Sequence, residues 1–333
     1  MSVVMIEPEA FWKKPGPFVD LLQDAGHEIR YADESTFARG RHSEEETVRQ
    51  LAGCDASMAG GVHYTPSVMD QLPELKIIAR CGVGYDRVDV AAATERGKVL
   101  TITPYSNHES VAELAFALIL SCAKRLAFND RNMREGGWPN QLTKPIRKQT
   151  LGLIGLGRIG RSTAVRGVAL GMKVIAHELY PDEKFVRQHG IELVTQDELL
   201  ARSDYVSLHC PLNDETHGMC DSAFFAKMKA GSTLINTSRG GLVQESALLA
   251  ALNSDHLRAA GLDVFEQEPT PADNPLRSND KVVMSPHIAG TDEMSMEGMG
   301  VECAENIIAL LKGEWPEASI VNREVKELWD SSR

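Results

Sequence analysis

Short apolar runs alternate with longer amphipathic segments over the N-terminal third of the chain. The short runs are typical of buried strands, and the longer segments of helices that cover a sheet. This alternation predicts a parallel sheet with helices on its faces. One expected helix begins with Ser43 and Glu46 at the spacing of a capping box. We expect strands at Val3–Ile6, His27–Tyr31, Asp55–Ala59, Lys76–Ala79 and Val99–Thr103, and helices at Pro17–Ala25, Ser43–Ala52 and Val90–Arg96.

A second series of the same kind begins at Thr150. Between the two series, Ser110–Arg125 is apolar nearly all the way round, so we expect a helix buried on all sides, between domains or between subunits. The last helix, Glu293–Leu311, follows the second series and is expected to return to the first unit. The strands expected in the second series are Leu151–Ile154, Lys173–His177, Glu192–Val194, Tyr205–His209, Thr233–Asn236, Ala259–Leu262 and Val282–Ser285.

A glycine-rich loop directly follows the first strand of the second series and leads into a helix. In a G-x-G-x-x-G loop the glycines allow a tight turn, the approach of a pyrophosphate and close helix–strand packing. The helix then points its free N–H groups at the phosphates. The motif alone also fits a purely structural turn, but strand, loop and helix together predict a nicotinamide dinucleotide site. The loop residues expected at the cofactor are Gly155, Gly157, Arg158, Ile159 and Gly160.

An acidic residue, Glu178, stands at the end of the next strand, 18 residues after Gly160. A carboxylate at this position accepts hydrogen bonds from the adenosine ribose and repels a 2′-phosphate. No Arg or Lys follows Glu178 before Lys184. The sequence therefore favours NAD over NADP.

The composition, with 43% hydrophobic and 25% charged residues, is that of a globular protein. At about 100–200 residues per domain, the length predicts two domains. The net charge of −12 makes a general role on nucleic acid or on an anionic membrane surface unfavourable. The longest apolar stretch, Leu114–Leu120, is too short to span a bilayer.

Six scattered cysteines show neither C-x-x-C spacing nor a His–Cys cluster at zinc spacing. We therefore expect reduced cysteines and no metal site. The N-terminal segment, Met1–Glu9, has neither a basic region nor a long apolar core, so no signal peptide is expected. These features predict a cytoplasmic protein.

Three further segments follow the glycine loop in a fixed order: Asn236–Leu248, Gly261–Pro269 and Ser285–Gly290. With the loop, they resemble the D-isomer-specific 2-hydroxyacid dehydrogenases, the family of phosphoglycerate dehydrogenase and glyoxylate/hydroxypyruvate reductase. Arg80–Asp89 resembles the substrate loop of that family, and Asn107–Glu113 the start of its interdomain helix. The resemblance implies hydride transfer between NAD(H) and a small 2-oxo or 2-hydroxy acid.

The resemblance also implies an α/β fold with two doubly wound parallel-sheet domains. A Rossmann NAD-binding domain, residues 104–287, would be inserted in a flavodoxin-like substrate domain made of residues 1–103 and 288–333. Hinges are expected near Thr103–Pro104 and Pro286–Ile288, and the cleft between the domains would hold nicotinamide and substrate.

Arg239, Glu268 and His287 are the expected catalytic residues. A guanidinium matches a substrate carboxylate and can polarise a ketone; the resemblance gives this role to Arg239, beside Gly240–Gly241, where we expect little backbone crowding. Protonation of the ketone needs an acid that works near neutral pH, and His287 stands at a strand end. Glu268 would hold its other nitrogen and favour the imidazolium. The non-catalytic alternatives are a surface ion pair for Arg239, a loop histidine that caps a helix for His287, and an exposed loop acid for Glu268.

Further contacts follow from the resemblance. Asp263 would bind the carboxamide of the nicotinamide, or else cap a helix. His209 is expected on the cofactor side or in a structural role, not in catalysis. Backbone N–H groups of Val83 and Gly84 would bind the substrate carboxylate, or else only form a turn. The remaining residues expected at the ligands are Asn107 for substrate, and Thr237 and His287 for cofactor.

The substrate stays open between phosphoglycerate, glyoxylate and hydroxypyruvate types. Arg80 matches a basic position of phosphoglycerate dehydrogenases, but Gly60 and Gly61 stand where those enzymes carry an Arg–Ser pair, and the chain ends at Arg333 without their regulatory domain. Formate dehydrogenases of the superfamily carry an amide at Glu268, so this acid favours 2-oxo acids. C-terminal-binding co-repressors share the fold and the Arg–Glu–His set, which makes an NAD-gated binding protein the alternative, although the chain has no room for their long tail.

We also expect a homodimer. Leu114–Leu120 lies in a helix too apolar to face water, and exposed patches of that kind are normally covered. In the resembled family this region packs across a two-fold interface.

Overall fold

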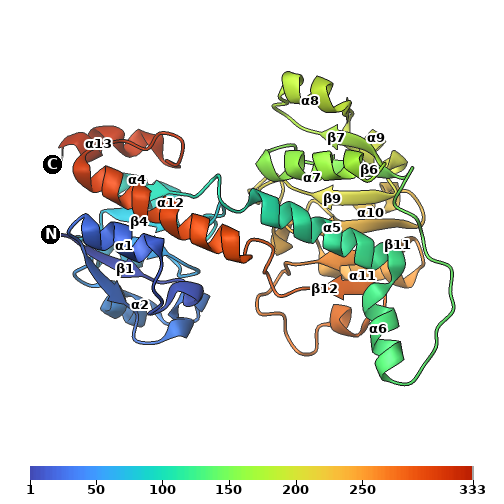
Figure 1. The fold of residues 1–333 in the computed structure, drawn as a ribbon, viewed down its shortest axis with the longest axis horizontal. Coiled ribbons are helices and arrows are strands. Elements are labelled where there is room, and N and C mark those ends of the chain that lie inside the picture. Colours follow the sequence, from blue (N-terminus) through green and yellow to red (C-terminus); the bar gives the residue numbers. More distant parts are fainter. Residues whose placement is uncertain (332–333) are drawn as a thin grey trace. The chain divides into compact units, whose positions relative to one another are not determined.

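The computed structural model describes residues 1–331 (Figure 1). The chain divides into two compact units: Met1–Asn107 with Thr291–Arg333, and His108–Gly290. These boundaries lie four and three residues after the expected ones. Each unit contains one parallel sheet, so the predicted α/β class with two doubly wound sheets is confirmed.

The first unit contains a five-stranded sheet in the order β2-β1-β3-β4-β5, all parallel. The order reverses between β1 and β3, as in flavodoxin-like sheets. Each predicted strand is present to within two residues at its ends. The strands are β1 (Val3–Ile6), β2 (Glu28–Tyr31), β3 (Ala56–Ala59), β4 (Ile77–Arg80) and β5 (Val99–Thr101). The helices are α1 (Pro17–Asp24), α2 (Glu44–Leu51), α3 (Pro66–Asp70), α4 (Val90–Glu95), α12 (Glu293–Lys312) and α13 (Lys326–Ser331).

Alternate residues of these strands face two separate cores, because successive side chains of a strand point to opposite faces. Val4 and Ile6 pack with α1 and α12, whereas Met5 packs on the opposite side with Leu51. The helix α12 lies against α1, β3 and β4, so the C-terminal segment completes the first unit.

The second unit contains a seven-stranded parallel sheet in the order β12-β11-β10-β9-β6-β7-β8. The strand order reverses between β6 and β9, as in dinucleotide-binding folds. The strands are β6 (Thr150–Ile154), β7 (Lys173–His177), β8 (Glu192–Leu193), β9 (Tyr205–Leu208), β10 (Ser232–Asn236), β11 (Leu257–Leu262) and β12 (Val282–Met284). The helices are α5 (His108–Lys124), α6 (Leu126–Arg134), α7 (Arg158–Ala169), α8 (Glu183–His189), α9 (Gln196–Arg202), α10 (Ser222–Lys227) and α11 (Glu245–Asn253).

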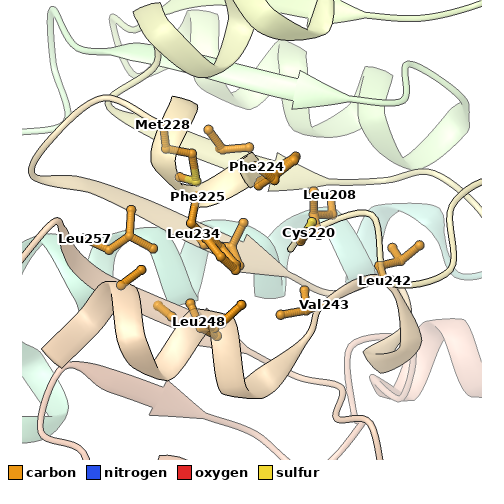
Figure 2. Close-up of a cluster of buried hydrophobic side chains, with 14 of the residues drawn as sticks. Leu208, Cys220, Phe224, Phe225, Met228, Leu234, Leu242, Val243, Leu248 and Leu257 are labelled. Atoms are coloured by element: carbon orange, nitrogen blue, oxygen red, sulfur yellow. The ribbon is translucent and has the colours of Figure 1, made fainter. Parts of the chain in front are cut away.

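One core of the second unit lies between this sheet and the helices α9, α10 and α11 (Figure 2). Phe224 and Phe225 of α10 meet edge to face, with ring centroids 5.6 Å apart. Leu234 of β10 and Leu248 of α11 belong to the same core. A second core on the other face of the sheet contains α5 and α7 side chains. The sheet is therefore buried on both faces, as a parallel sheet requires.

Two sequence predictions need correction. The helix α5 packs within its own unit, on α7 and the strands β10 to β12, and a stripe of Glu113, Ala117, Leu120 and Lys124 is exposed. The rest of this chain therefore does not bury α5 on all sides. The capping box of α2 is half formed: Ser43 accepts the Glu46 N–H, but the Glu46 carboxylate binds Arg49 instead.

Candidate active site

The glycine loop lies at the point where the strand order reverses. Gly155 has φ +96°, and a Cβ there would lie 2.6 Å from the carbonyl oxygen of His209, just after β9. A Cβ at Gly160 would lie 2.3 Å from the Gly155 oxygen. Both positions therefore exclude side chains, which lets the loop, the start of α7 and the end of β9 approach closely.

The space in front of α7 is open. Gly157 is the N-cap residue, it has no side chain to cap the helix, and nothing lies within 4 Å of a Cβ built on it. The first N–H groups of a twelve-residue helix therefore face space that a pyrophosphate can fill. Arg158 and Ile159, the first helical residues, border this space. These features fit a dinucleotide.

The acid predicted to read the ribose lies against this loop. The Glu178 carboxylate accepts the Leu156 N–H at 2.6 Å and the Tyr180 N–H at 2.9 Å. A cation from α7 is also close: Arg161 donates to the Leu156 oxygen at 3.1 Å and to Asp182 at 3.0 Å. The sequence did not predict this contact, because Arg161 does not lie in the segment after Glu178. Its bond to Asp182 holds it in an ion pair.

Two further residues expected on the cofactor side follow neighbouring strands. The Thr237 hydroxyl, directly after β10, is buried without a hydrogen-bond partner among the described residues. Such an orphaned group fits a contact to a bound ligand. His209 bonds Ser207 through Nε2 at 2.9 Å, and desolvation lowers its pKa to about 4. It is therefore neutral near pH 7, which fits a cofactor-side or structural role and not that of an acid.

Asp263, directly after β11, is fully buried and holds the segment that carries His287. Its carboxylate accepts hydrogen bonds from Ser285 Oγ at 2.6 Å, the Ile288 N–H at 3.0 Å and the Ala289 N–H at 2.8 Å. Its backbone oxygen accepts the His287 N–H at 2.8 Å. Asp263 thus fixes the loop after β12, a role that the sequence did not suggest.

His287 and Glu268 are brought together. Nδ1 of His287 lies 2.7 Å from Oε2 of Glu268, whose Oε1 accepts the Phe265 N–H at 3.1 Å. The carboxylate fixes the ring with Nδ1 as donor. Nε2 has no hydrogen-bond partner within residues 1–331, and the side chain is 50% exposed. The ring therefore presents Nε2 to a ligand.

Arg239 follows β10 and precedes the short helix η3 (Gly240–Leu242). The expectation of little crowding beside it is wrong. A Cβ at Gly240 would lie 1.8 Å from the Phe265 carbonyl oxygen, so Gly240 allows the Arg239 segment to touch the segment that leads to Glu268. The Arg239 backbone oxygen is held by Asn236 Nδ2 at 2.8 Å. Close packing, not free space, positions this arginine.

In the first unit, Val83 and Gly84 lie in the loop after β4. Their N–H groups have no hydrogen-bond partner among the described residues. The loop is fixed on both sides, by the Gly82 N–H bond to Thr103 Oγ1 at 2.8 Å and the Arg80 bond to the Gly84 oxygen at 3.1 Å. Asn107 contributes a buried Oδ1 that also lacks a partner there.

A buried cluster that the sequence reasoning missed lies next to this loop. Glu7, directly after β1, accepts hydrogen bonds from Ser57, Tyr64 and the Gly60 N–H. Burial raises its pKa, while the nearby Arg80 guanidinium opposes that rise. The only sequence signal was an acid at the end of an apolar strand, which is uncommon inside a protein.

Residues 1–331 include no helix long and apolar enough to cross a membrane. Nor do they include a group of three or more His, Cys, Asp or Glu side chains that could hold a metal ion.

The chain is similar to known dehydrogenases along most of its length. Residues 116–289 match the NAD-binding domain of the D-isomer specific 2-hydroxyacid dehydrogenases. A glyoxylate reductase of Korarchaeum cryptofilum is 39% identical over 85% of this chain and 87% of its own length. A D-3-phosphoglycerate dehydrogenase of Mycobacterium tuberculosis is 41% identical over 80% of this chain, but the match spans about half of that protein, 52%.

Solved structures agree. A D-lactate dehydrogenase from Aquifex aeolicus, complexed with NAD and lactic acid, superimposes with a TM-score of 0.81 at 30% identity, over 96% of this chain and 99% of that one. The fold, the glycine loop and these matches together show that the chain belongs to the D-isomer specific 2-hydroxyacid dehydrogenases and is an NAD-dependent oxidoreductase acting on 2-hydroxy acids.

Proposed function

We propose that this enzyme interconverts a small, unphosphorylated 2-oxo acid and its 2-hydroxy acid, with Arg239, Glu268 and His287 as the catalytic residues. The observation that carries the proposal is the 2.7 Å bond between His287 Nδ1 and Glu268 Oε2. It fixes one nitrogen of a half-exposed imidazole and leaves the other for the substrate. A buried structural histidine would have both nitrogens satisfied.

In the reduction direction His287 donates its Nε2 proton to the substrate oxygen as the ketone becomes a hydroxyl. Glu268 stabilises the imidazolium that must be present before this transfer. Arg239 binds the substrate carboxylate and polarises the ketone with the same planar guanidinium. Bound NADH supplies the hydride. In the reverse direction, His287 accepts the hydroxyl proton.

The proposed cofactor contacts come from one edge of the seven-stranded sheet. The N–H groups at the start of α7, from Gly157 to Gly160, would bind the pyrophosphate, and Glu178 the adenosine ribose. Thr237 and His209 would line the cofactor side, and Asp263 would reach the carboxamide while it holds the His287 loop. Val83, Gly84 and Asn107 stay proposed substrate contacts.

The substrate class rests on the segment after β3. A Cβ at Gly60 would lie 2.8 Å from Ala38 Cβ, and one at Gly61 would lie 2.3 Å from the Ala38 oxygen. Neither position can therefore carry a phosphate-binding side chain without a backbone shift. The Arg80 guanidinium donates to the Gly84 and Ala59 oxygens. These contacts direct Arg80 inward and favour an acid without a phosphate.

The test is initial-rate reduction by NADH of glyoxylate, hydroxypyruvate and the 3-phosphorylated analogue of hydroxypyruvate. We expect kcat/KM to be higher for an unphosphorylated acid, and His287→Ala to lose about 10²–10⁴-fold in turnover while NADH affinity is kept. Preference for the phosphorylated acid would overturn the substrate class. A folded His287→Ala variant with near wild-type turnover would overturn the mechanism.

We further propose a homodimer formed through the second unit. Large apolar side chains on α6 and the segment after it are exposed, including Trp138 at 84% and Leu142 at 94%. Exposed apolar patches of this kind are usually covered. Light scattering should give the mass of a dimer for the wild-type protein. Leu142→Asp should lower this mass, whereas Leu328→Asp, which replaces an exposed leucine of the first unit, should leave it unchanged. A monomeric wild-type protein would refute the proposal.

We also propose a cytoplasmic location. The six free cysteines support it, because thiols persist in a reducing compartment. Fractionation of the native host should recover the protein with cytoplasmic markers, and recovery with membranes or in an oxidising compartment would contradict this.

A further inference from the structure

Two cysteines that the proposed chemistry does not use face each other in the first unit. Cys81 directly follows β4, and Cys303 lies in α12, yet their sulfur atoms are only 3.4 Å apart. Both are free thiols. They are separated by 222 residues in sequence, so the fold itself brings them together.

The packing of α12 on β3 and β4 creates this proximity. Cys303 is fully buried in the core that contains Ile77 and Ala79, and Cys81 packs against the same core from its edge. The Cys303 thiol also points toward the Ala79 oxygen at 3.5 Å. The two side chains therefore meet where the sheet ends and the loop of Val83 and Gly84 begins.

We propose that Cys81 and Cys303 form a reversible disulfide that ties the start of this loop to α12. A disulfide needs sulfur atoms about 2.05 Å apart, so the two sulfurs must approach by about 1.3 Å. Each cysteine has a rotatable bond between Cα and Cβ, and Cys81 lies partly at the surface, where its side chain can turn. The fixed packing of α12 supplies the proximity.

The oxidant is a peroxide. Cys81 reacts first because it is the more exposed thiol, and burial raises the pKa of the Cys303 thiol. The Cys81 thiolate attacks a peroxide oxygen, the O–O bond breaks, and the departing hydroxide takes a proton to become water. This leaves a sulfenic acid on Cys81.

The Cys303 sulfur then attacks the Cys81 sulfur. The S–S bond forms as the S–O bond breaks, and the hydroxide leaves as water with the Cys303 proton. Overall the two thiols lose two protons and two electrons, and one hydrogen peroxide becomes two waters. A dithiol reductant reverses the reaction by thiol–disulfide exchange.

The link would alter the neighbouring loop. Gly82, directly after Cys81, is held by Thr103 through two hydrogen bonds, at 2.8 and 3.1 Å. A shift of Cys81 toward α12 must displace or strain this anchor, and with it the N–H groups of Val83 and Gly84. If these groups bind the substrate carboxylate, as the proposed function holds, loss of one such bond raises KM about tenfold.

The experiment treats the full-length protein with a small excess of hydrogen peroxide, blocks remaining thiols by alkylation under denaturing conditions, and maps peptides without reduction. We expect free thiols to fall from six to four, one linked pair of peptides that contains Cys81 and Cys303, and recovery of both thiols with dithiothreitol. Cys54→Ser, a buried cysteine of the same unit, should keep the link, whereas Cys81→Ser and Cys303→Ser should abolish it.

The mass readout does not depend on any activity, so it separates this proposal from the proposed function. Oxidation of Cys81 to sulfinic acid, or a linkage between other cysteines, while Cys303 stays open to alkylation would overturn the disulfide. A linked protein with unchanged KM for its 2-oxo acid would leave the disulfide standing and overturn its effect on the loop. The wild-type peptide map decides the first point even if Cys303→Ser fails to fold.

Discussion

The role of Asp263 gives the sharpest test of how this site is built. Its carboxylate accepts three hydrogen bonds from the segment of Ser285 to Ala289 and is shielded from solvent. A residue that acts only on the cofactor would leave the free enzyme unchanged when replaced. A residue that holds the His287 loop would destabilise the free enzyme as well. Asp263→Ala separates the two roles.

The size of the loss follows from where the three donors lie. The Ala289 N–H is buried, so without its acceptor it costs about 1–3 kcal/mol. The donors of Ser285 and Ile288 are less buried and can turn to water, so each loses only about 0.5–1.5 kcal/mol. We therefore expect Asp263→Ala to lower the free energy of unfolding by about 2–6 kcal/mol. Asp263→Asn keeps one oxygen and should lose roughly half as much.

The assay is urea unfolding of the cofactor-free protein, together with hydrogen exchange of the Ile288 and Ala289 amides and titration with NADH. Asp221→Ala is the matched control, since Asp221 only caps α10 through the Phe224 N–H at 2.8 Å. The control should cost about 1 kcal/mol and leave amide exchange in the loop unchanged. If Asp263→Ala matches the control in stability and exchange and loses only NADH affinity, the positioning role is refuted.

Three other outcomes are expected. Glu178→Ser should lower the ratio of kcat/KM for NADH over NADPH, and an unchanged ratio would contradict the role of this acid. Gly240→Ala should lower both the melting temperature and turnover, because its Cβ would collide with the Phe265 oxygen, whereas Gly157→Ala should melt normally and bind NADH more weakly. Burial raises the pKa of Glu7 above 4.5. Between pH 4.5 and this raised pKa, unfolding releases a proton, so the free energy of unfolding falls as pH rises through that range. Glu7→Gln should flatten this pH dependence in urea unfolding across a pH series.

Periodicity predicted the strands well, because most of them are short apolar runs. The strand Lys173–His177 was placed to the residue, and Val3–Ile6 likewise. The α5 helix differs from its prediction for another reason. Its apolar surface predicts burial on all sides between domains or between subunits, whereas within this chain its own sheet and α7 cover most of it and one stripe stays exposed. The apolar composition of a helix indicates how much of its surface is buried, but not which element covers it.

The sequence likewise predicted some features of the candidate site and not others. The glycine loop and Glu178 could be predicted because the strand–loop–helix motif and the acid at the end of the next strand follow a recurring spacing. No recurring spacing marks the ion pair of Arg161 with Asp182 or the cluster around Glu7, so neither could be predicted. Sequence spacing alone does not reveal which helix turn faces which loop.

His287 shows why such long-range contacts matter for chemistry. Its backbone lies in the left-handed region, with φ +56°, where a non-glycine residue is strained by about 1–3 kcal/mol. Glycine would relieve that strain but would remove the imidazole. The hydrogen bonds from this segment to Asp263 offset the strain, at about 0.5–1.5 kcal/mol each, and the Glu268 carboxylate then orients the ring. The two carboxylates thus have different roles. The buried Asp263 holds the backbone of His287 in an unfavourable conformation, and the more exposed Glu268 determines which ring nitrogen faces the substrate.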